Sequence, residues 1–190
     1  MPRNPEEARK RLRHAALQLF AENGFDQTTA AEIAARAGVT ERTFFRHFPD
    51  KREVLFEGQE ILGRALSEAI GKAPPELSPI ETLHRAFAAI TEMLEQNRQY
   101  SEPRQRIIAA NPALQEREVA KHAAIMRVVA QALQRRGVER LRADLAAQAG
   151  SAALSYALAG WFADPTLRLN DYLDQAFVEL QRLSLPTSGP

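Results

Sequence analysis

The sequence predicts an all-α protein, and three observations support this fold class. No segment alternates apolar and polar residues over the length of a strand, and β-branched residues are sparse. Ala, Leu, Arg, Gln and Glu, which are good helix formers, dominate the chain. Residues that cap helices precede proline at Asn4, Ser78 and Asn111. We expect about nine helices, over residues 5–23, 29–37, 40–47, 51–72, 79–97, 101–109, 112–136, 140–163 and 170–184.

The composition excludes several classes of protein. The 190 residues include no cysteine, which excludes disulfides, thiolate metal sites and cysteine nucleophiles. The N-terminal segment lacks the apolar run of a signal peptide, and no apolar stretch approaches the length that crosses a bilayer. We therefore expect a soluble, cytoplasmic protein.

The segment from Thr28 to Lys51 predicts a helix, a short turn and a second helix. Thr29 lies three residues before Glu32, which is the spacing of a capping box at a helix start. Gly38 follows as a helix stop, because glycine enters the left-handed region without steric penalty. Thr40 then caps the second helix, which Pro49 ends, and Asp50 with Glu53 predicts a capping box for a fourth helix.

The second helix of this unit is short and basic on its outer faces. Phe44 and Phe48 are four residues apart and face inward. The basic and hydroxyl side chains on the outer faces donate hydrogen bonds to phosphate oxygens, and arginine also reads guanine edges. The pattern is therefore typical of a helix that enters the major groove of DNA. The alternative is an ordinary helical corner with solvated charges. The outer residues are Arg42, Thr43, Arg46 and His47.

The net charge of +1 conceals an uneven distribution. Residues 1–52 hold ten Lys or Arg against seven Asp or Glu, whereas residues 53–190 hold fifteen against seventeen. The basic excess lies on the predicted reading unit, where attraction to phosphates requires it. Because this excess is small, we expect DNA binding to need two copies of the unit.

Residues 8–56 resemble the DNA-binding domain of the TetR family of transcriptional regulators, through AALQLFAENGFDQTT, IAARAGVT and TFFRHFPDKREVL. The resemblance implies that Thr29 holds a phosphate at a helix N-terminus and that Arg42 lies at a base contact. The family usually has Tyr where this chain has Phe45, and phenylalanine cannot donate a hydrogen bond to phosphate. The predicted DNA contacts are Thr29, Thr40, Arg42, Thr43, Phe45, Arg46, His47 and Lys51.

The chain divides, by this interpretation, into a three-helix helix-turn-helix domain (1–50), a helical-bundle domain for ligand binding and dimerisation (51–185) and a disordered tail (186–190). The apolar faces of the bundle predict either a closed core or a cavity, because both need the same side chains. The TetR resemblance favours a cavity for a small apolar effector. The predicted ligand contacts are Leu66, Phe87, Ile90, Leu94, Arg104, Ile107, Ile108, Ile125 and Val129.

The segment RQRIIAANPALQERE, residues 104–118, is similar to a stretch in the mycofactocin-type subfamily of TetR regulators, some of which respond to acyl-coenzyme A thioesters. The phosphate-bearing head of such a ligand needs cations near the entrance, such as Arg104 or Arg106. The alternative is that each arginine forms a surface salt bridge with Glu102 or Glu116.

We expect the eighth and ninth helices of each subunit to form a four-helix dimer interface. Small residues fill the eighth helix and allow another helix to approach closely, and the ninth carries an apolar stripe. The alternative is that both helices complete the core of a single chain. A two-fold dimer places two reading helices about one DNA turn apart, on a palindromic site. The predicted interface residues are Leu145, Ala149, Ala152, Tyr156, Leu173, Phe177 and Leu180.

A metal or cofactor site is not expected. Glu81 and His84 have the Glu-x-x-His spacing of carboxylate-bridged metal bundles, but this spacing occurs once.

We expect a ligand-responsive repressor and no enzyme, in which the ligand shifts a fourth helix that starts at Asp50. The alternatives are a metal-binding or enzymatic bundle with a structural helix-turn-helix, and a sequence-indifferent DNA-packaging protein.

Overall fold

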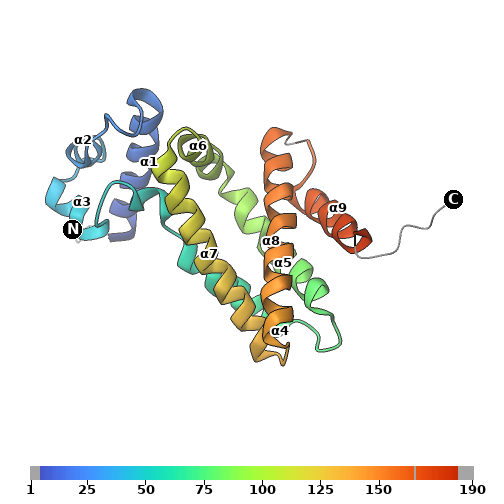
Figure 1. Cartoon of the computed structure of the whole chain (residues 1–190). Helices are drawn as coiled ribbons and strands as arrows, with labels where there is room; N and C mark the ends of the chain where they lie inside the picture. Colours follow the sequence, from blue (N-terminus) through green and yellow to red (C-terminus); the bar gives the residue numbers. More distant parts are fainter. Residues whose placement is uncertain (1–4, 165, 184–190) are drawn as a thin grey trace. The chain divides into compact units, whose positions relative to one another are not determined.

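The computed structural model describes residues 5–164 and 166–183, which form nine α-helices and one short 3-10 helix and contain no strand (Figure 1). The prediction of an all-α fold is confirmed. The predicted tail, 186–190, lies outside the described residues. The elements are α1 (Pro5–Asn23), α2 (Ala30–Arg36), α3 (Glu41–His47), η1 (Glu53–Phe56), α4 (Gln59–Lys72), α5 (Pro79–Gln96), α6 (Arg98–Ala109), α7 (Pro112–Arg135), α8 (Arg140–Ala163) and α9 (Leu169–Arg182).

The helices form two compact units. Unit 1 combines the chain up to Gly58 with Asn97–Lys121, and unit 2 combines Gln59–Gln96 with the chain from His122 onward. The boundary expected after residue 50 therefore falls inside unit 1. The helix-turn-helix shares its unit with η1, with α6 and with the first part of α7.

The predicted fourth helix, 51–72, is interrupted. Asp50 accepts hydrogen bonds from the backbone nitrogens of Arg52 (2.7 Å) and Glu53 (3.2 Å), as its predicted capping role requires. The chain then forms only the short helix η1, because Glu57 is extended (φ −67°, ψ 148°) and Gly58 follows it with a φ of 90°. Since α4 begins at Gln59, the expectation of one helix that starts at Asp50 is wrong.

The core of unit 1 is built around aromatic rings. Phe44 and Phe48 from the α3 region pack with residues of α1, α2 and η1. Ile108 of α6 and Leu114 of α7 are buried in the same cluster, and Ile107 packs against it. The apolar pattern predicts Ile107 and Ile108 in the bundle interior, whereas the structure buries Ile108 in the core of unit 1 and packs the partly buried Ile107 against that core.

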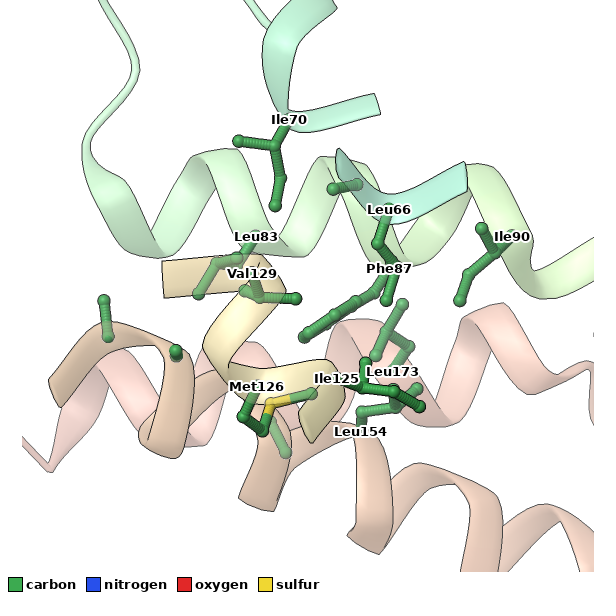
Figure 2. Close-up of a cluster of buried hydrophobic side chains, with 14 of the residues drawn as sticks. Leu66, Ile70, Leu83, Phe87, Ile90, Ile125, Met126, Val129, Leu154 and Leu173 are labelled. Carbon is green, nitrogen blue, oxygen red and sulfur yellow. The ribbon is translucent and has the colours of Figure 1, made fainter. Parts of the chain in front are cut away.

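The core of unit 2 combines side chains from α4, α5, α7, α8 and α9 (Figure 2). Leu66, Phe87 and Val129 are each fully buried within it. Gly150 allows α8 to pack closely on α5, because a Cβ atom there would lie 3.0 Å from Leu83 Cδ1. Part of the small-residue surface of α8 is thus used inside the unit. Nowhere in the described part of the chain is a helix both long and apolar enough to cross a membrane.

Candidate nucleic-acid interface

The first helix of the helix-turn-helix, α2, has the predicted capping box. The Thr29 backbone nitrogen donates to Glu32 Oε2 at 2.7 Å, and the Glu32 backbone nitrogen donates to Thr29 Oγ1 at 3.2 Å. Gly38 then takes a φ of 67°, and the Val39 nitrogen reaches back to the Ala34 carbonyl. This turn sets the angle between α2 and α3.

The second helix, α3, has one buried and one exposed face. Thr40 caps its start by accepting a hydrogen bond from the Thr43 nitrogen at 3.2 Å. Phe44 is completely buried, while the adjacent Phe45 is half exposed and packs edge to face against it. Arg42 and Arg46 are exposed. The helix is therefore anchored by one aromatic ring and presents cations and a second ring to solvent.

His47 lies at the end of α3 with its ring partly buried. Burial, followed by the positive charges of Arg46 and Arg9, holds the pKa of His47 below its usual value of 6.5. Its Nε2 atom is buried and has no hydrogen-bond partner among the described residues. The backbone carbonyl of His47 accepts a hydrogen bond from Arg9 at 3.4 Å, which ties α3 to α1.

Lys51 is engaged in a way that the sequence did not indicate. Its ammonium group donates to the carbonyl oxygens of Phe25 (2.7 Å), Asp26 (3.2 Å) and Thr28 (2.8 Å). It also lies 4.4 Å from the centre of the Phe25 ring. Since an ammonium group has three donors, these contacts use all of them. The predicted phosphate contact of Lys51 would have to compete with this network.

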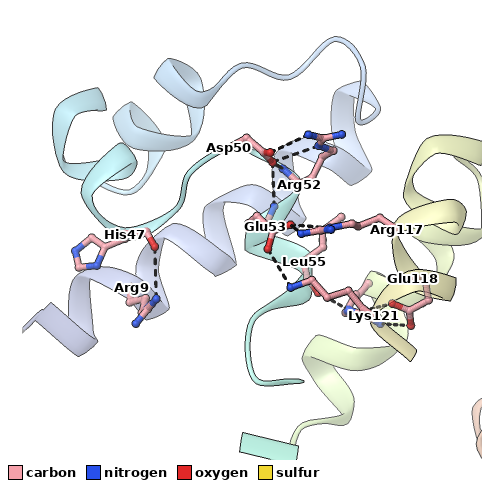
Figure 3. A network of polar contacts seen from close by, with 10 residues as sticks. Arg9, His47, Asp50, Arg52, Glu53, Leu55, Arg117, Glu118 and Lys121 are labelled. Carbon is pink, nitrogen blue, oxygen red and sulfur yellow. Dashed lines mark hydrogen bonds and ion pairs between the residues drawn. The ribbon is translucent and has the colours of Figure 1, made fainter. Parts of the chain in front are cut away.

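A polar network holds η1 within unit 1 (Figure 3). Glu53 accepts hydrogen bonds from Arg117 (2.7 Å) and Lys121 (3.2 Å), both on α7. The predicted reciprocal capping by Glu53 is therefore replaced by contacts that lie more than sixty positions away in the sequence. No local spacing signals such a pairing.

Arg104 belongs to the same network and not to a ligand site in the bundle. Its Nε donates to the Leu55 carbonyl at 2.5 Å, and its Nη2 pairs with Glu118 at 2.6 Å. A ligand contact of Arg104, as predicted, would have to compete with these two partners. Arg106 pairs with Glu102, as the alternative interpretation expected.

The remaining predicted ligand contacts lie in unit 2. Most are buried in its apolar core, and Leu94 packs on the edge of that core. A surface hollow of about 340 Å³ in this unit is lined by residues of the 75–82 and 136–142 segments, none of which is a predicted ligand contact. The buried residues are Leu66, Phe87, Ile90, Ile125 and Val129.

The predicted interface residues on α8 and α9 differ in exposure. Leu145 and Tyr156 on α8 are 62% and 67% exposed, and Ala152 is also exposed. By contrast, Leu173 and Phe177 on α9 are buried in the core of unit 2. Ala149 and Leu180 are partly buried. An exposed apolar stripe is thus present on α8, and the inner face of α9 serves the chain's own core.

Glu81 and His84, which have the spacing of metal ligands, have other partners. Glu81 caps α5 by accepting from the Ser78 nitrogen at 2.9 Å, and His84 bonds Asp174 at 2.6 Å. Among the described residues, no group of three or more His, Asp or Glu side chains is placed to hold a metal ion.

Two family models match the chain. Residues 12–57 match the family described as bacterial regulatory proteins of the tetR family, and residues 77–184 match the MftR C-terminal domain. Together they agree with both resemblances stated from the sequence.

Individual relatives are transcriptional regulators. The chain is 35% identical to the regulator TcmR of Streptomyces glaucescens, over 43% of this chain and 36% of TcmR. A protein named as the mycofactocin biosynthesis regulator MftR, from Mycobacterium tuberculosis, is 24% identical over 85% of this chain and 83% of its own length. The alignments with several relatives, TcmR among them, span less than half of those proteins.

The fold is also similar to that of solved regulators. The structure of Thermus thermophilus FadR in complex with lauroyl-CoA matches with a TM-score of 0.61 and 24% identity, over 96% of this chain and 97% of FadR.

Proposed function

Because the chain belongs to the tetR family of bacterial regulatory proteins, whose relatives are named regulators and not enzymes, we propose that it is a cytoplasmic transcriptional repressor. It binds a palindromic operator as a homodimer and leaves it when a small apolar effector binds. The observation that carries this proposal is the exposed face of α3, where Arg42, Phe45 and Arg46 project from a helix anchored by Phe44.

The DNA contact begins with that face. Arg42 lies in the first turn of α3, where base edges are usually read, and Arg46 lies one turn further along. Thr29, Thr40 and Thr43 supply hydroxyl groups around the two helix starts. Phe45 packs on a thymine methyl group or a sugar, since its ring has no donor. The cations on this face give affinity, and Arg42 gives sequence preference.

The homodimer forms through α8. Leu141, Leu145, Ala152 and Tyr156 are exposed on this helix, and they recur at intervals of three to four residues or multiples of them. A stripe of this kind leaves apolar surface in water unless a partner covers it. Val178, which is 44% exposed on α9, is the α9 residue that we add to this interface in place of Leu173 and Phe177.

The effector binds in unit 2, among the side chains of its apolar core. The match of residues 77–184 to the MftR C-terminal domain supports this location, and the FadR complex shows that a protein of this fold takes lauroyl-CoA. A chain of methylene groups fits between side chains such as Leu66, Phe87 and Val129 only if they move apart, because each is fully buried. We therefore expect the effector to separate α5 from α7 within the unit.

The operator contact is tested with Arg42→Ala and a charge-matched control, Arg127→Ala, at an exposed position of α7. Fluorescence anisotropy with a duplex selected from random DNA should show that Arg42→Ala weakens binding about 10- to 100-fold, the value of one bidentate base contact. Arg127→Ala should bind as the unaltered protein does. Equal affinities for all three proteins would refute the assignment of α3 as the reading helix.

A further inference from the structure

The two units are joined by the chain at three places, and these differ in backbone structure. The first connection is Gly58–Gln59, where a φ of 90° separates η1 from α4. The second joins the end of α5 to the start of α6. The third, Lys121–His122, falls inside α7, which continues without interruption from Pro112 to Arg135. Of the described helices, α7 is the one with turns in both units.

On the unit 1 side, a short stretch of α7 holds two polar groups of η1, the Glu53 carboxylate directly and the Leu55 carbonyl through Arg104. Arg117 and Lys121 bind the carboxylate of Glu53, which lies only 17% exposed between them. Glu118 orients Arg104, whose Nε donates to the Leu55 carbonyl. The position of η1 is therefore set by α7 and by the residue of α6 that α7 orients.

Tyr100 reinforces this arrangement from α6. Its hydroxyl donates to the Val54 carbonyl at 2.8 Å, and burial raises the pKa of Tyr100 to about 12. Together with Arg104, it occupies two successive carbonyls of η1. Since Asp50 caps η1 directly after α3 and Pro49, a displacement of η1 must also displace the end of the reading helix.

On the unit 2 side, the next residue of α7 makes a partly buried polar contact. His122 Nε2 lies 2.5 Å from Ser151 Oγ on α8, and Ser151 is only 5% exposed. One turn further along, Ile125 and Met126 enter the apolar core of unit 2. The stretch 117–126 thus connects the position of η1 with the packing of the core where the effector is proposed to bind.

We propose that α7, and not a lever formed by α4, transmits the state of unit 2 to the reading helix, with Glu53, Arg104 and His122 as its positioning residues. The inference rests on the proposed function. An intact helix transmits a shift along its axis, because displacing one turn strains the hydrogen bonds of the next. The break at Gly58 lets α4 turn without moving η1, because glycine rotates about φ at little cost.

The test is a double-mutant cycle in the full-length protein, measured as affinity for the selected operator. One change, Ser151→Ala, removes the partner of His122 in unit 2. The other, Arg117→Ala with Lys121→Ala, releases Glu53 in unit 1. Ser151→Ala should weaken operator binding at least about threefold in the unaltered background and less than about 1.5-fold once Glu53 is released, because contacts in one network are not additive.

Two further measurements separate positioning from general damage. Affinity for a non-specific duplex should not change in Ser151→Ala, since every phosphate contact remains. The conservative variant Arg117→Lys with Lys121→Arg keeps both charges. In this background, Ser151→Ala should again weaken operator binding at least about threefold. Hydrogen exchange at residues 53–56 should be faster in Ser151→Ala than in the unaltered protein, which reports on η1 without DNA.

Additive effects in the cycle, or unchanged exchange at residues 53–56, would overturn the assignment of α7. Failure of the proposed function has a different signature, since Arg42→Ala would then bind the operator normally. An additive cycle combined with weak binding by Arg42→Ala removes only the role of α7.

Discussion

Helices α3 and α8 are both half buried, but their exposed faces differ in chemistry. The exposed face of α3 carries Arg42 and Arg46, whereas that of α8 carries Leu145 and Tyr156. The buried face of α3 rests on one phenylalanine ring, while that of α8 is made largely of small residues that let neighbouring helices approach.

The difference shows how an exposed face indicates a partner. Cations on a short helix suit the phosphates and guanine edges of DNA, since charge attraction acts through water. Apolar side chains on a long helix suit a second apolar surface, since burial is their source of stabilisation. The contrast can be tested by substitutions on and around the two helices, taken here in order of decreasing expected effect.

The largest effect is expected from neighbouring phenylalanines on α3. Phe44→Ala should lower the free energy of unfolding by about 3–5 kcal/mol, because it empties a fully buried site. Phe45→Ala, at a half-exposed ring, should change it by less than about 1 kcal/mol while still weakening DNA binding. Urea unfolding curves measure both. Equal losses of stability in Phe44→Ala and Phe45→Ala would mean that Phe45 supports the fold and is not exposed for contact with DNA.

The next effect concerns the exposed face of α8. Leu145→Glu should make the protein monomeric and lower operator affinity about 100-fold or more, because the second reading helix is then no longer tethered. Val119→Glu, at a 69% exposed apolar position of α7, is the matched control and should leave the dimer intact. Sedimentation velocity reports the mass, and a dimeric Leu145→Glu protein would exclude α8 as the interface.

Lys51 tests whether a cation near α3 acts on DNA or on the fold. Lys51→Met removes three hydrogen bonds to carbonyl oxygens, so unfolding free energy should fall by about 1–3 kcal/mol. The salt dependence of DNA binding should keep its slope, because the ammonium has no donor left for phosphate. A slope reduced by about 0.9, the value of one lost phosphate contact, would instead favour the role expected from the family resemblance.

His47 should give the smallest effect, through pH. Its pKa in the folded protein is lowered from 6.5, so the unfolded chain binds the proton more readily, and stability is lost as pH falls below 6.5. A nearby phosphate favours the protonated ring, so operator affinity should rise about two- to fivefold between pH 8 and pH 6 with uptake of a proton. His47→Gln should abolish this rise, and His14→Gln, at an exposed position of α1, should retain it. Calorimetry in buffers of different ionisation enthalpy measures the proton uptake.

Local chemistry made much of unit 1 predictable. Capping at Thr29 and Thr40, the stop at Gly38 and the inward spacing of Phe44 and Phe48 depend on residues within four positions of one another. These features locate α2 and α3 and identify the exposed face of α3. The sequence pattern does not predict the interruption of the fourth helix, although Gly58 stands at the break, because glycine within a helical pattern is often tolerated.

Sequence alone determined the all-α class, the helix-turn-helix elements α2 and α3 and the apolar character of α8, because each is encoded by spacing along one element. Only the tertiary structure decided which apolar faces meet which. It assigned Ile107 and Ile108 to unit 1, Phe177 to the core of unit 2, and Arg104 to the Leu55 carbonyl. Helical periodicity specifies that a face is buried but not which surface covers it, because any apolar surface satisfies the hydrophobic effect. Ion pairs such as Glu53 with Arg117 join residues that only the folded chain brings together.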